Sequence, residues 1–321
     1  MSKTKDSGLD SRAALSYPRT YAAWPHLMTR LVALLLTLCI ACPFPAYPWW
    51  ETGHQVVARI AAAHLTPAAR TRIARILDVP DNPEGIADAL AKASTWADET
   101  KSETKTGAWH YIDLTIEDHK SDIPERCKDD NCAPARIRLF AEQLAGHPGH
   151  LGNTRWSQLD ALRYLVHLVG DVHQPLHTIS DADLGGNCEL LDPPVGKAKN
   201  LHALWDGGII DQINTSDRAL AEELDDAIEG LGPHREHVLA EGKEDDWVWE
   251  SHELAVRDIY RRLHIPVEPV EFPASCAEAP AEITGLRLDI PAFYISEMKP
   301  VVREQLIKGG LRLARLLNES L

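Results

Sequence analysis

The sequence predicts an all-α protein with one mostly helical domain, and three observations support this fold class. Apolar residues recur at helical spacing in a series of segments, whereas the alternation typical of β-strands is scarce. Prolines and glycines punctuate the chain between these segments, but no repeat or low-complexity linker divides it. Hydrophobic residues make up 44% of the 321 residues, which is enough to bury a single substantial core.

The helical periodicity places the expected elements in chain order. Helices are predicted over residues 56–65, 68–77, 87–96, 133–144, 159–172, 220–231, 247–263 and 301–317. Proline and glycine clusters predict turns between them, and residues 266–280 predict a long loop before the final helix. Since loops commonly carry binding and catalytic residues, we expect the long loops of this chain to form its functional cleft.

Residues 1–48 are expected to be a leader that contains a secretory signal peptide. Met28 and Arg30 precede an apolar run over residues 31–41, which has the layout of a signal peptide and is short for a membrane span. Residues 1–27 lack this layout, so we expect translation to start at Met28. The folded domain is then expected to cover residues 49–321 and to be secreted or periplasmic.

The chain is strongly acidic, with a net charge of −15 when histidine is counted as neutral. Such a protein repels polyanions at long range and lacks the basic stripe with which non-specific nucleic-acid binders neutralise phosphates. Two interpretations remain open at this point. Either nucleic acid is not the partner, or bound metal cations supply positive charge locally.

The cysteines beyond the leader are compatible with disulfide bonds. Export would place Cys127, Cys132, Cys188 and Cys276 in a compartment that permits oxidation. Cys127 and Cys132 are close enough in sequence to staple a small loop. Cys188 and Cys276 pair by elimination only, and the alternative that both are free thiols fits the sequence equally well.

Histidine and aspartate recur at spacings that suit a metal ion. His167 and Asp171 lie four residues apart in a predicted helix, so they share one face. Pro175 ends this helix, and the chain turns to bring His177 close to the same helix end. Taken alone, one such pair is usually a surface salt bridge or hydrogen bond. A third histidine placed by a proline turn favours metal binding over that interpretation.

Further candidates strengthen the case for metal. His202 and Asp206 repeat the four-residue spacing, and Asp98 and His110 each lie beside a tryptophan that would exclude water. Polar groups in apolar contexts are difficult to explain as solvated surface. Nitrogen and oxygen donors without thiolates suit zinc, although manganese or iron accepts the same donors.

These motifs resemble the trinuclear zinc nuclease family of the S-one/P-one type, the single-strand-preferring endonucleases of fungi, plants and bacteria. They occur in the family's order and span most of the chain beyond the leader. The matching segments are Trp49–His54, Trp96–Asp98, His110–Asp113, His167–His177, Gly185–Asn187 and Asn200–Asp206.

The resemblance implies three zinc ions per chain. It places Trp49 at the mature N-terminus, where its α-amino nitrogen and carbonyl oxygen bind metal together with His54 and a bridging Asp171. The implied ligands are Asp98, His110, His167 and Asp171 for one ion, Asp171, His54 and Trp49 for a second, and His177, His202 and Asp206 for a third. His173 is expected to support the ligands rather than to bind metal.

The resemblance also implies an activity, namely hydrolysis of single-stranded DNA and RNA to 5′-phosphate products, with 3′-nucleotidase activity. Asp98 would also be catalytic, as a base or by orienting the attacking water. The implied base pocket consists of Tyr111, Asp113, Leu184 and Asn187. An equally open interpretation is that Tyr111 and Asp113 only brace His110. The expected partners are single-stranded nucleic acids and nucleotides, the protein being a monomer without a stable protein partner.

Two other functions remain compatible with the motifs. A zinc phospholipase C shares this metal geometry in a related family and would place a lipid phosphodiester at the site. A non-catalytic exported zinc-binding protein would retain the metal without hydrolysing any phosphodiester. Hydrolysis of RNA compared with release of phosphocholine from lecithin separates the first alternative from a nuclease.

Overall fold

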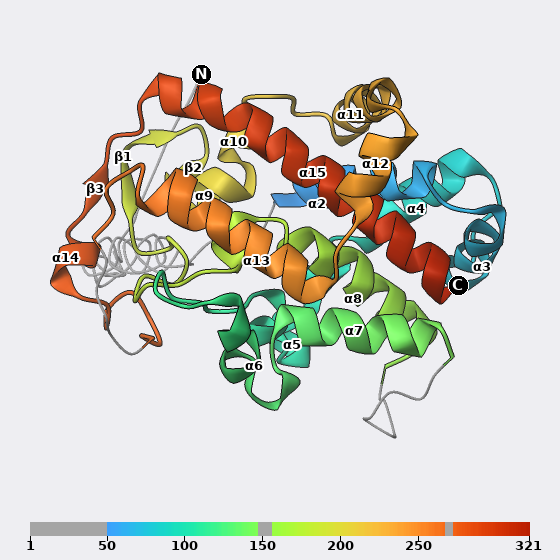
Figure 1. The fold of residues 1–321 in the computed structure, drawn as a ribbon, viewed down its shortest axis with the longest axis horizontal. Coiled ribbons are helices and arrows are strands. Elements are labelled where there is room, and N and C mark those ends of the chain that lie inside the picture. Colours follow the sequence, from blue (N-terminus) through green and yellow to red (C-terminus); the bar gives the residue numbers. More distant parts are fainter. Residues whose placement is uncertain (1–49, 147–155, 267–271) are drawn as a thin grey trace, which may run out of the picture. The chain divides into compact units, whose positions relative to one another are not determined.

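Helices dominate the part of the chain that the structure describes. This computed structural model describes residues 50–146, 156–266 and 272–321 (Figure 1). The described residues belong to one compact unit. The expected leader and Trp49 lie outside the described residues. The predicted mostly helical fold is confirmed, because the described strands form only one small sheet.

Some of the described α-helices follow one another closely along the chain, and longer segments separate others. Three short 3-10 turns lie between α5 and α7, one follows α8, and the π-helical turns Leu204–Gly208 and Ala255–Tyr260 continue α9 and α13. The α-helices are α2 (Trp50–Ala63), α3 (Pro67–Leu77), α4 (Pro83–Ala93), α5 (Trp96–Thr104), α6 (Ile123–Arg126), α7 (Ala133–Leu144), α8 (Gln158–Asp171), α9 (Leu201–Ala203), α10 (Ile209–Asp211), α11 (Asp217–Leu231), α12 (Pro233–Ala240), α13 (Glu244–Leu254), α14 (Ala281–Thr284) and α15 (Ala292–Ser320).

The core lies where α2, α8 and α15 pack against one another, with α4 and α7 beside them (Figure 1). Helix α8 is buried along almost its whole second half, from Tyr164 to Asp171. A helix that is buried on all sides must carry few polar residues unless they have partners or a function. Two of the buried residues in α8 are nevertheless His167 and Asp171.

Local sequence explains where several helices begin. The side chain of Ser157 accepts a hydrogen bond from the Asp160 backbone N–H, and the Asp160 side chain accepts one from the Ser157 N–H, which is a capping box at the start of α8. Thr66 and Asn82 cap α3 and α4, and a proline follows each of them. These caps satisfy N–H groups that the first helical turn leaves without partners.

Several predicted helix boundaries were wrong, and two of them have a clear physical cause. The segment 87–96 was predicted as one helix, but α4 ends at Ala93 and Trp96 begins α5. The final helix was predicted to start at Val301, yet α15 begins at Ala292 and continues through Pro300. Packing accounts for this continuation: Tyr294 is buried upstream of the proline, and its hydroxyl donates to the Asp258 carbonyl at 3.1 Å.

The small sheet has the order β2-β1-β3 and was not predicted. Strand β1 (Leu190–Val195) pairs antiparallel with β2 (Ala198–Asn200) and parallel with β3 (Arg287–Leu288). Its residues show little regular alternation of burial, so a period-2 pattern could not reveal it.

Both possible disulfides form. Cys127 bonds to Cys132 as predicted, and Cys188 bonds to Cys276, which contradicts the alternative of two free thiols. The second disulfide joins the segment before β1 to the segment before α14, and the sheet pairs the same two regions of the chain. Among the described helices, none combines the length and the apolar character that a membrane crossing requires.

Candidate metal centre

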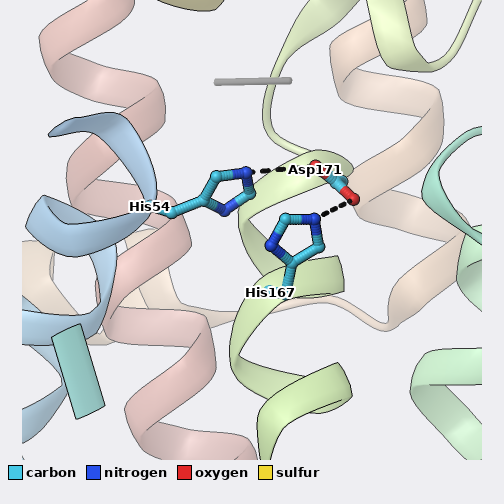
Figure 2. Close-up of side chains that lie close together, drawn as sticks. All are labelled: His54, His167 and Asp171. Carbon is cyan, nitrogen blue, oxygen red and sulfur yellow. Dashed lines mark ion pairs between the residues drawn. The ribbon is translucent and has the colours of Figure 1, made fainter. Parts of the chain in front are cut away.

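The buried end of α8 presents an imidazole and a carboxylate to the same point. His167 and Asp171 are one helical turn apart, and His167 Nε2 lies 3.2 Å from Asp171 Oδ2 (Figure 2). Helix α2 adds His54, whose Nε2 lies 3.4 Å from Asp171 Oδ1. The rings of His54 and His167 stack with centroids 3.9 Å apart. All three side chains are almost completely buried.

Asp98 and His110 complete a second group around His167. His110 Nδ1 lies 3.0 Å from Asp171 Oδ2, 3.4 Å from Asp98 Oδ1 and 2.9 Å from His167 Nε2. Asp98 comes from the first turn of α5, and His110 ends a short 3-10 turn after that helix. Asp171 therefore contacts both groups, one through each carboxylate oxygen.

The third group consists of His177, His202 and Asp206. Asp206 Oδ1 lies 3.5 Å from His177 Nε2, and Asp206 Oδ2 lies 3.3 Å from His202 Nε2. His177 also connects this group to the first, because its Nδ1 is 3.4 Å from Asp171 Oδ1. The proline turn after α8 thus delivers His177 beside the helix end, as its position after Pro175 predicts.

Hydrogen bonds to backbone carbonyls orient three of the histidine rings. Nδ1 of His167 donates to the Ser94 carbonyl at 2.5 Å, and Nδ1 of His202 donates to the Gly185 carbonyl at 2.7 Å. Nδ1 of His177 donates to the His110 carbonyl at 2.9 Å. Because a neutral imidazole carries one N–H, these bonds leave Nε2 of each ring as the atom with a lone pair. The Nε2 atom of His167 faces Asp171, and those of His177 and His202 face Asp206.

The electrostatic field of the site favours a cation. Burial lowers the pKa of His54, His110 and His202, so these imidazoles are neutral ligand candidates. Burial also opposes the protonation of His167, but the carboxylates of Asp171 and Asp98 outweigh it and raise the pKa of His167 to about 10. The attraction that holds a proton on a buried imidazole acts on a divalent ion as well, and metal and proton then compete.

The geometry fits zinc. With Zn–N and Zn–O distances of about 2.0–2.2 Å, two ligand atoms of a tetrahedral ion lie roughly 3.3 Å apart. In each of the three groups the ligand atoms lie within 4.8 Å of one another, and the separations given above scatter around the tetrahedral value. Asp171 is fully buried, and its carboxylate oxygens are faced by imidazole nitrogens at 3.0–3.4 Å without a hydrogen bond of good geometry. A bound cation would satisfy both of these oxygens.

The predicted base-pocket residues divide between two places. Tyr111, which is 41% exposed, and Asp113 line a cavity of about 610 Å³ together with Arg126 and Phe272. Burial and the nearby Asp183 raise the pKa of Asp113 to about 6. Leu184 and Asn187 do not line this cavity. They lie instead on the turn that carries Gly185, beside His202.

The structure also shows what the side chains of His173 and Lys101 contact. His173 points away from the three metal groups, as predicted: its Nδ1 donates to the Val169 carbonyl, and its Nε2 accepts from Arg312 at 3.0 Å. Lys101 Nζ donates to Asp98 Oδ1 at 3.1 Å. The spacing of three residues on α5 places the two side chains on one face of the helix.

The sequence analysis also missed the residues that support the ligands. Gly170 is one of them: a Cβ atom at this position would lie 2.7 Å from His54 Nδ1, so α2 can bring His54 this close only beside a glycine. The carbonyls of Ser94 and Gly185 are others, and no sequence pattern identifies a carbonyl that receives a ring N–H from a distant residue.

The chain is similar to known nucleases. The family model described as S1/P1 Nuclease matches residues 49–321. Endonuclease 2 of Arabidopsis thaliana is 28% identical over 300 residues, which cover 90% of this chain and 96% of the relative. Nuclease P1 of Penicillium citrinum is 26% identical over 292 residues, covering 84% and 97% respectively. Nuclease S1 of Aspergillus oryzae is 31% identical over 168 residues, covering 50% and 54%. The chain belongs to the S1/P1 nuclease family.

Proposed function

We propose that this nuclease hydrolyses single-stranded DNA and RNA with three zinc ions, releases 5′-phosphate products and also removes 3′-phosphates from nucleotides. Membership of the family makes the chain a hydrolase of phosphodiester bonds. The observation that carries the finer proposal is the buried carboxylate of Asp171, which stands between two groups of imidazole nitrogens. One bridging carboxylate is what a closely spaced pair of ions requires.

The proposed ligands combine the three groups of the structure with the division among ions that the family resemblance implies. Asp171 would bridge the first two ions, and the α-amino group of Trp49 would complete the second after cleavage of the leader. The ligands are Asp98, His110, His167 and Asp171 for the first ion, His54, Asp171 and Trp49 for the second, and His177, His202 and Asp206 for the third.

When bound, zinc supplies Lewis acidity, which lowers the pKa of water from about 15.7 toward about 7 and offsets the charge of a phosphate. Asp98 has the position for a second task. Without metal, the positive charges of His167 and Lys101 outweigh the effect of burial and lower the pKa of Asp98 to about 2. A cation in place of the His167 proton would act in the same direction, so the carboxylate is ionised at neutral pH. An ionised carboxylate at the centre can accept a hydrogen bond from the attacking water and align it with the phosphorus atom.

Tyr111 and Asp113 support a preference for single strands. They follow His110 directly in the chain, and the Ile112 N–H between them donates to the His177 carbonyl at 2.9 Å, which ties this segment to the metal centre. The half-exposed ring of Tyr111 offers a face for an unstacked base, and Asp113 offers a hydrogen-bonding edge. A base inside a duplex cannot reach such a site.

Three bound divalent cations would also explain how an acidic protein can attract a nucleic acid. The chain has a net charge of −15, which repels a polyanion at distance. Asp98, Asp171 and Asp206 are the carboxylates of the centre, and six positive charges on three ions exceed their three negative charges. The phosphate would then be attracted at close range although the protein surface is acidic.

Two disulfides support the proposal that the protein acts outside the reducing cytoplasm. We propose that residues 49–321 are the mature, secreted or periplasmic enzyme and that it acts as a monomer on nucleic acids and nucleotides. Cleavage directly before Trp49 would make export a step in assembling the metal centre.

The test uses protein purified from the exported fraction. Its N-terminal residue, its zinc content per chain and its hydrolysis of single-stranded DNA and RNA are measured, the last with and without a chelator. Three zinc ions, a Trp49 terminus and chelator-sensitive release of 5′-mononucleotides are expected. Release of phosphocholine from lecithin without hydrolysis of RNA would indicate a phospholipase C instead of a nuclease. Retained zinc without any phosphodiesterase activity would indicate a non-catalytic zinc-binding protein.

A further inference from the structure

The turn before β1 has an unusual backbone. Ala182, Leu184, Gly185 and Gly186 have φ values of +63°, +57°, +62° and +80°. Two of these residues have a Cβ atom, which clashes with the backbone in this conformation and makes it unfavourable. A strained turn persists only where surrounding interactions stabilise it. The hydrogen bonds to this turn therefore show which residues stabilise its backbone.

One carboxylate holds the turn. Asp183 Oδ1 accepts hydrogen bonds from the backbone N–H groups of Asp181 and Gly185, both at 3.0 Å. Its Oδ2 accepts from the Gly186 N–H at 2.9 Å and from the Tyr260 hydroxyl at 2.5 Å. Asp183 is almost completely buried, so these four donors replace its hydration.

This turn fixes the position of His202, one of the candidate metal ligands. The Gly185 carbonyl accepts from Nδ1 of His202 at 2.7 Å, and the Gly186 carbonyl accepts from the His202 backbone N–H at 2.9 Å. Both the ring and the backbone of His202 are therefore fixed by the two glycines that Asp183 binds. A Cβ atom on Gly185 would lie 2.5 Å from the Leu176 carbonyl oxygen, so no larger residue can take its position.

We propose that Asp183 is a positioning residue for the ion held by His177, His202 and Asp206. It acts through the Gly185-Gly186 backbone, which sets the tautomer and the direction of the His202 ring. This inference rests on the proposed zinc site, and it assigns a role to a carboxylate that contacts none of the proposed ligands directly. Groups that orient a metal-binding histidine commonly contribute about 10- to 100-fold to metal affinity.

The chemistry requires a carboxylate at this position. An amide offers only one acceptor oxygen, and its NH₂ group would face N–H donors that need an acceptor. Asp183→Asn therefore keeps the size of the side chain but removes part of the support for Gly185 and Gly186. Tyr260→Phe removes only one of the four donors to Asp183 and leaves the three backbone bonds in place.

Two variants serve as matched controls. Asp258→Asn makes the same change at another buried aspartate, whose carboxylate oxygens accept from Arg257 and not from the turn. Tyr164→Phe removes the hydroxyl of another buried tyrosine, which bonds to Thr106 at 3.3 Å and contacts no part of the turn. Both controls are expected to keep the wild-type zinc affinities.

The experiment measures zinc affinity by competition with a chelator of known affinity, on folded full-length mature protein. For Asp183→Asn we expect one of three zinc ions to bind about 10- to 100-fold more weakly, with the other two unchanged and kcat reduced more than KM is raised. Tyr260→Phe should show a smaller loss at the same ion, and it carries the test if Asp183→Asn does not fold.

If both folded variants bind all three zinc ions with wild-type affinity, the proposal is overturned. An equal weakening of all three ions would also overturn it, because that result indicates a general loss of structure. Failure of the nuclease proposal is recognised separately: wild-type protein would then bind zinc without cleaving nucleic acid, and the comparison of zinc affinities would still decide the role of Asp183.

Discussion

The imidazole of His54 lies directly over Gly170, so closely that a methyl group on Gly170 would approach its Nδ1 to 2.7 Å. Helices α2 and α8 bring the two residues together, and the stacking of His54 on His167 depends on the missing side chain. The separation between His54 and His167, which we propose as ligands of two different ions, is therefore set by a residue that is not itself a ligand.

We expect Gly170→Ala to displace His54 and to weaken zinc binding at the ion shared by His54 and Asp171. Activity should fall by about 10- to 100-fold, the usual effect of disturbing the support of a metal ligand. Zinc content and hydrolysis of single-stranded DNA are the measurements. Gly230→Ala is the matched control: it also changes a helical glycine, but a Cβ atom there meets no other group within 4 Å. Equal activity of the two variants would contradict the prediction.

Removal of the metal should destabilise the protein. The carboxylates of Asp98, Asp171 and Asp206 are buried together, and without cations their desolvation and mutual repulsion oppose folding. A ligand present at about 1,000 times its Kd stabilises a folded protein by roughly 4 kcal/mol. Thermal unfolding with a chelator should therefore give a clearly lower Tm, and added zinc should restore it. Chelator presaturated with zinc is the control, and an unchanged Tm in free chelator would argue against resident ions.

Tyr111→Ala separates the two interpretations of Tyr111. If its exposed ring stacks on a base, KM for single-stranded substrate should rise by about 10- to 100-fold, since such stacking contributes roughly 1–3 kcal/mol. Zinc content would stay unchanged. If the ring only braces His110, zinc content would fall instead. Phe293→Ala removes another exposed aromatic ring, 62% accessible on α15, and should change neither quantity.

Glu189 should make stability depend on pH. Burial and the charge of Asp183 raise the pKa of Glu189 to about 9, well above its value of 4.5 in an unfolded chain. The folded protein therefore keeps a proton that the unfolded chain releases between these two values. Stability should fall as pH rises through this window, by at most about 1.4 kcal/mol per pH unit from this group.

Glu189→Gln is neutral at every pH and should flatten the dependence. Its Tm should exceed that of the wild type at pH 8 and approach it near pH 5. Unfolding curves between pH 5 and 9 measure both quantities. Parallel Tm profiles of the variant and the wild type would show that Glu189 is ionised in the folded protein.

Local spacing determined much of the candidate centre before any fold was known. His167 with Asp171 and His202 with Asp206 are four residues apart, and helical geometry alone places each pair on one face. Pro175 ends α8 and brings His177 back to the helix end, which is also a local effect. The helical fold class followed from the apolar periodicity for the same reason, because a period of 3.6 residues is a property of the chain itself.

The elements that were predicted wrongly are those that depend on contacts between residues far apart in sequence. Pro300 marks a helix start by its own chemistry, yet α15 continues through it because Tyr294 packs into the core and bonds to Asp258. Strand β1 pairs with β3 almost a hundred positions later, and the bond between Cys188 and Cys276 closes a comparable separation. No local pattern contains that information.

The sequence by itself determined which residues can bind metal and which of them share a helix face. Only the tertiary structure decided that His54 stacks on His167 beside Gly170, that Asp171 serves two groups, and that Asp183 supports the turn behind His202. The physical reason is that the first set depends on the geometry of a few consecutive peptide units. The second depends on how helices and turns far apart in sequence pack against one another and on which buried polar groups they must satisfy.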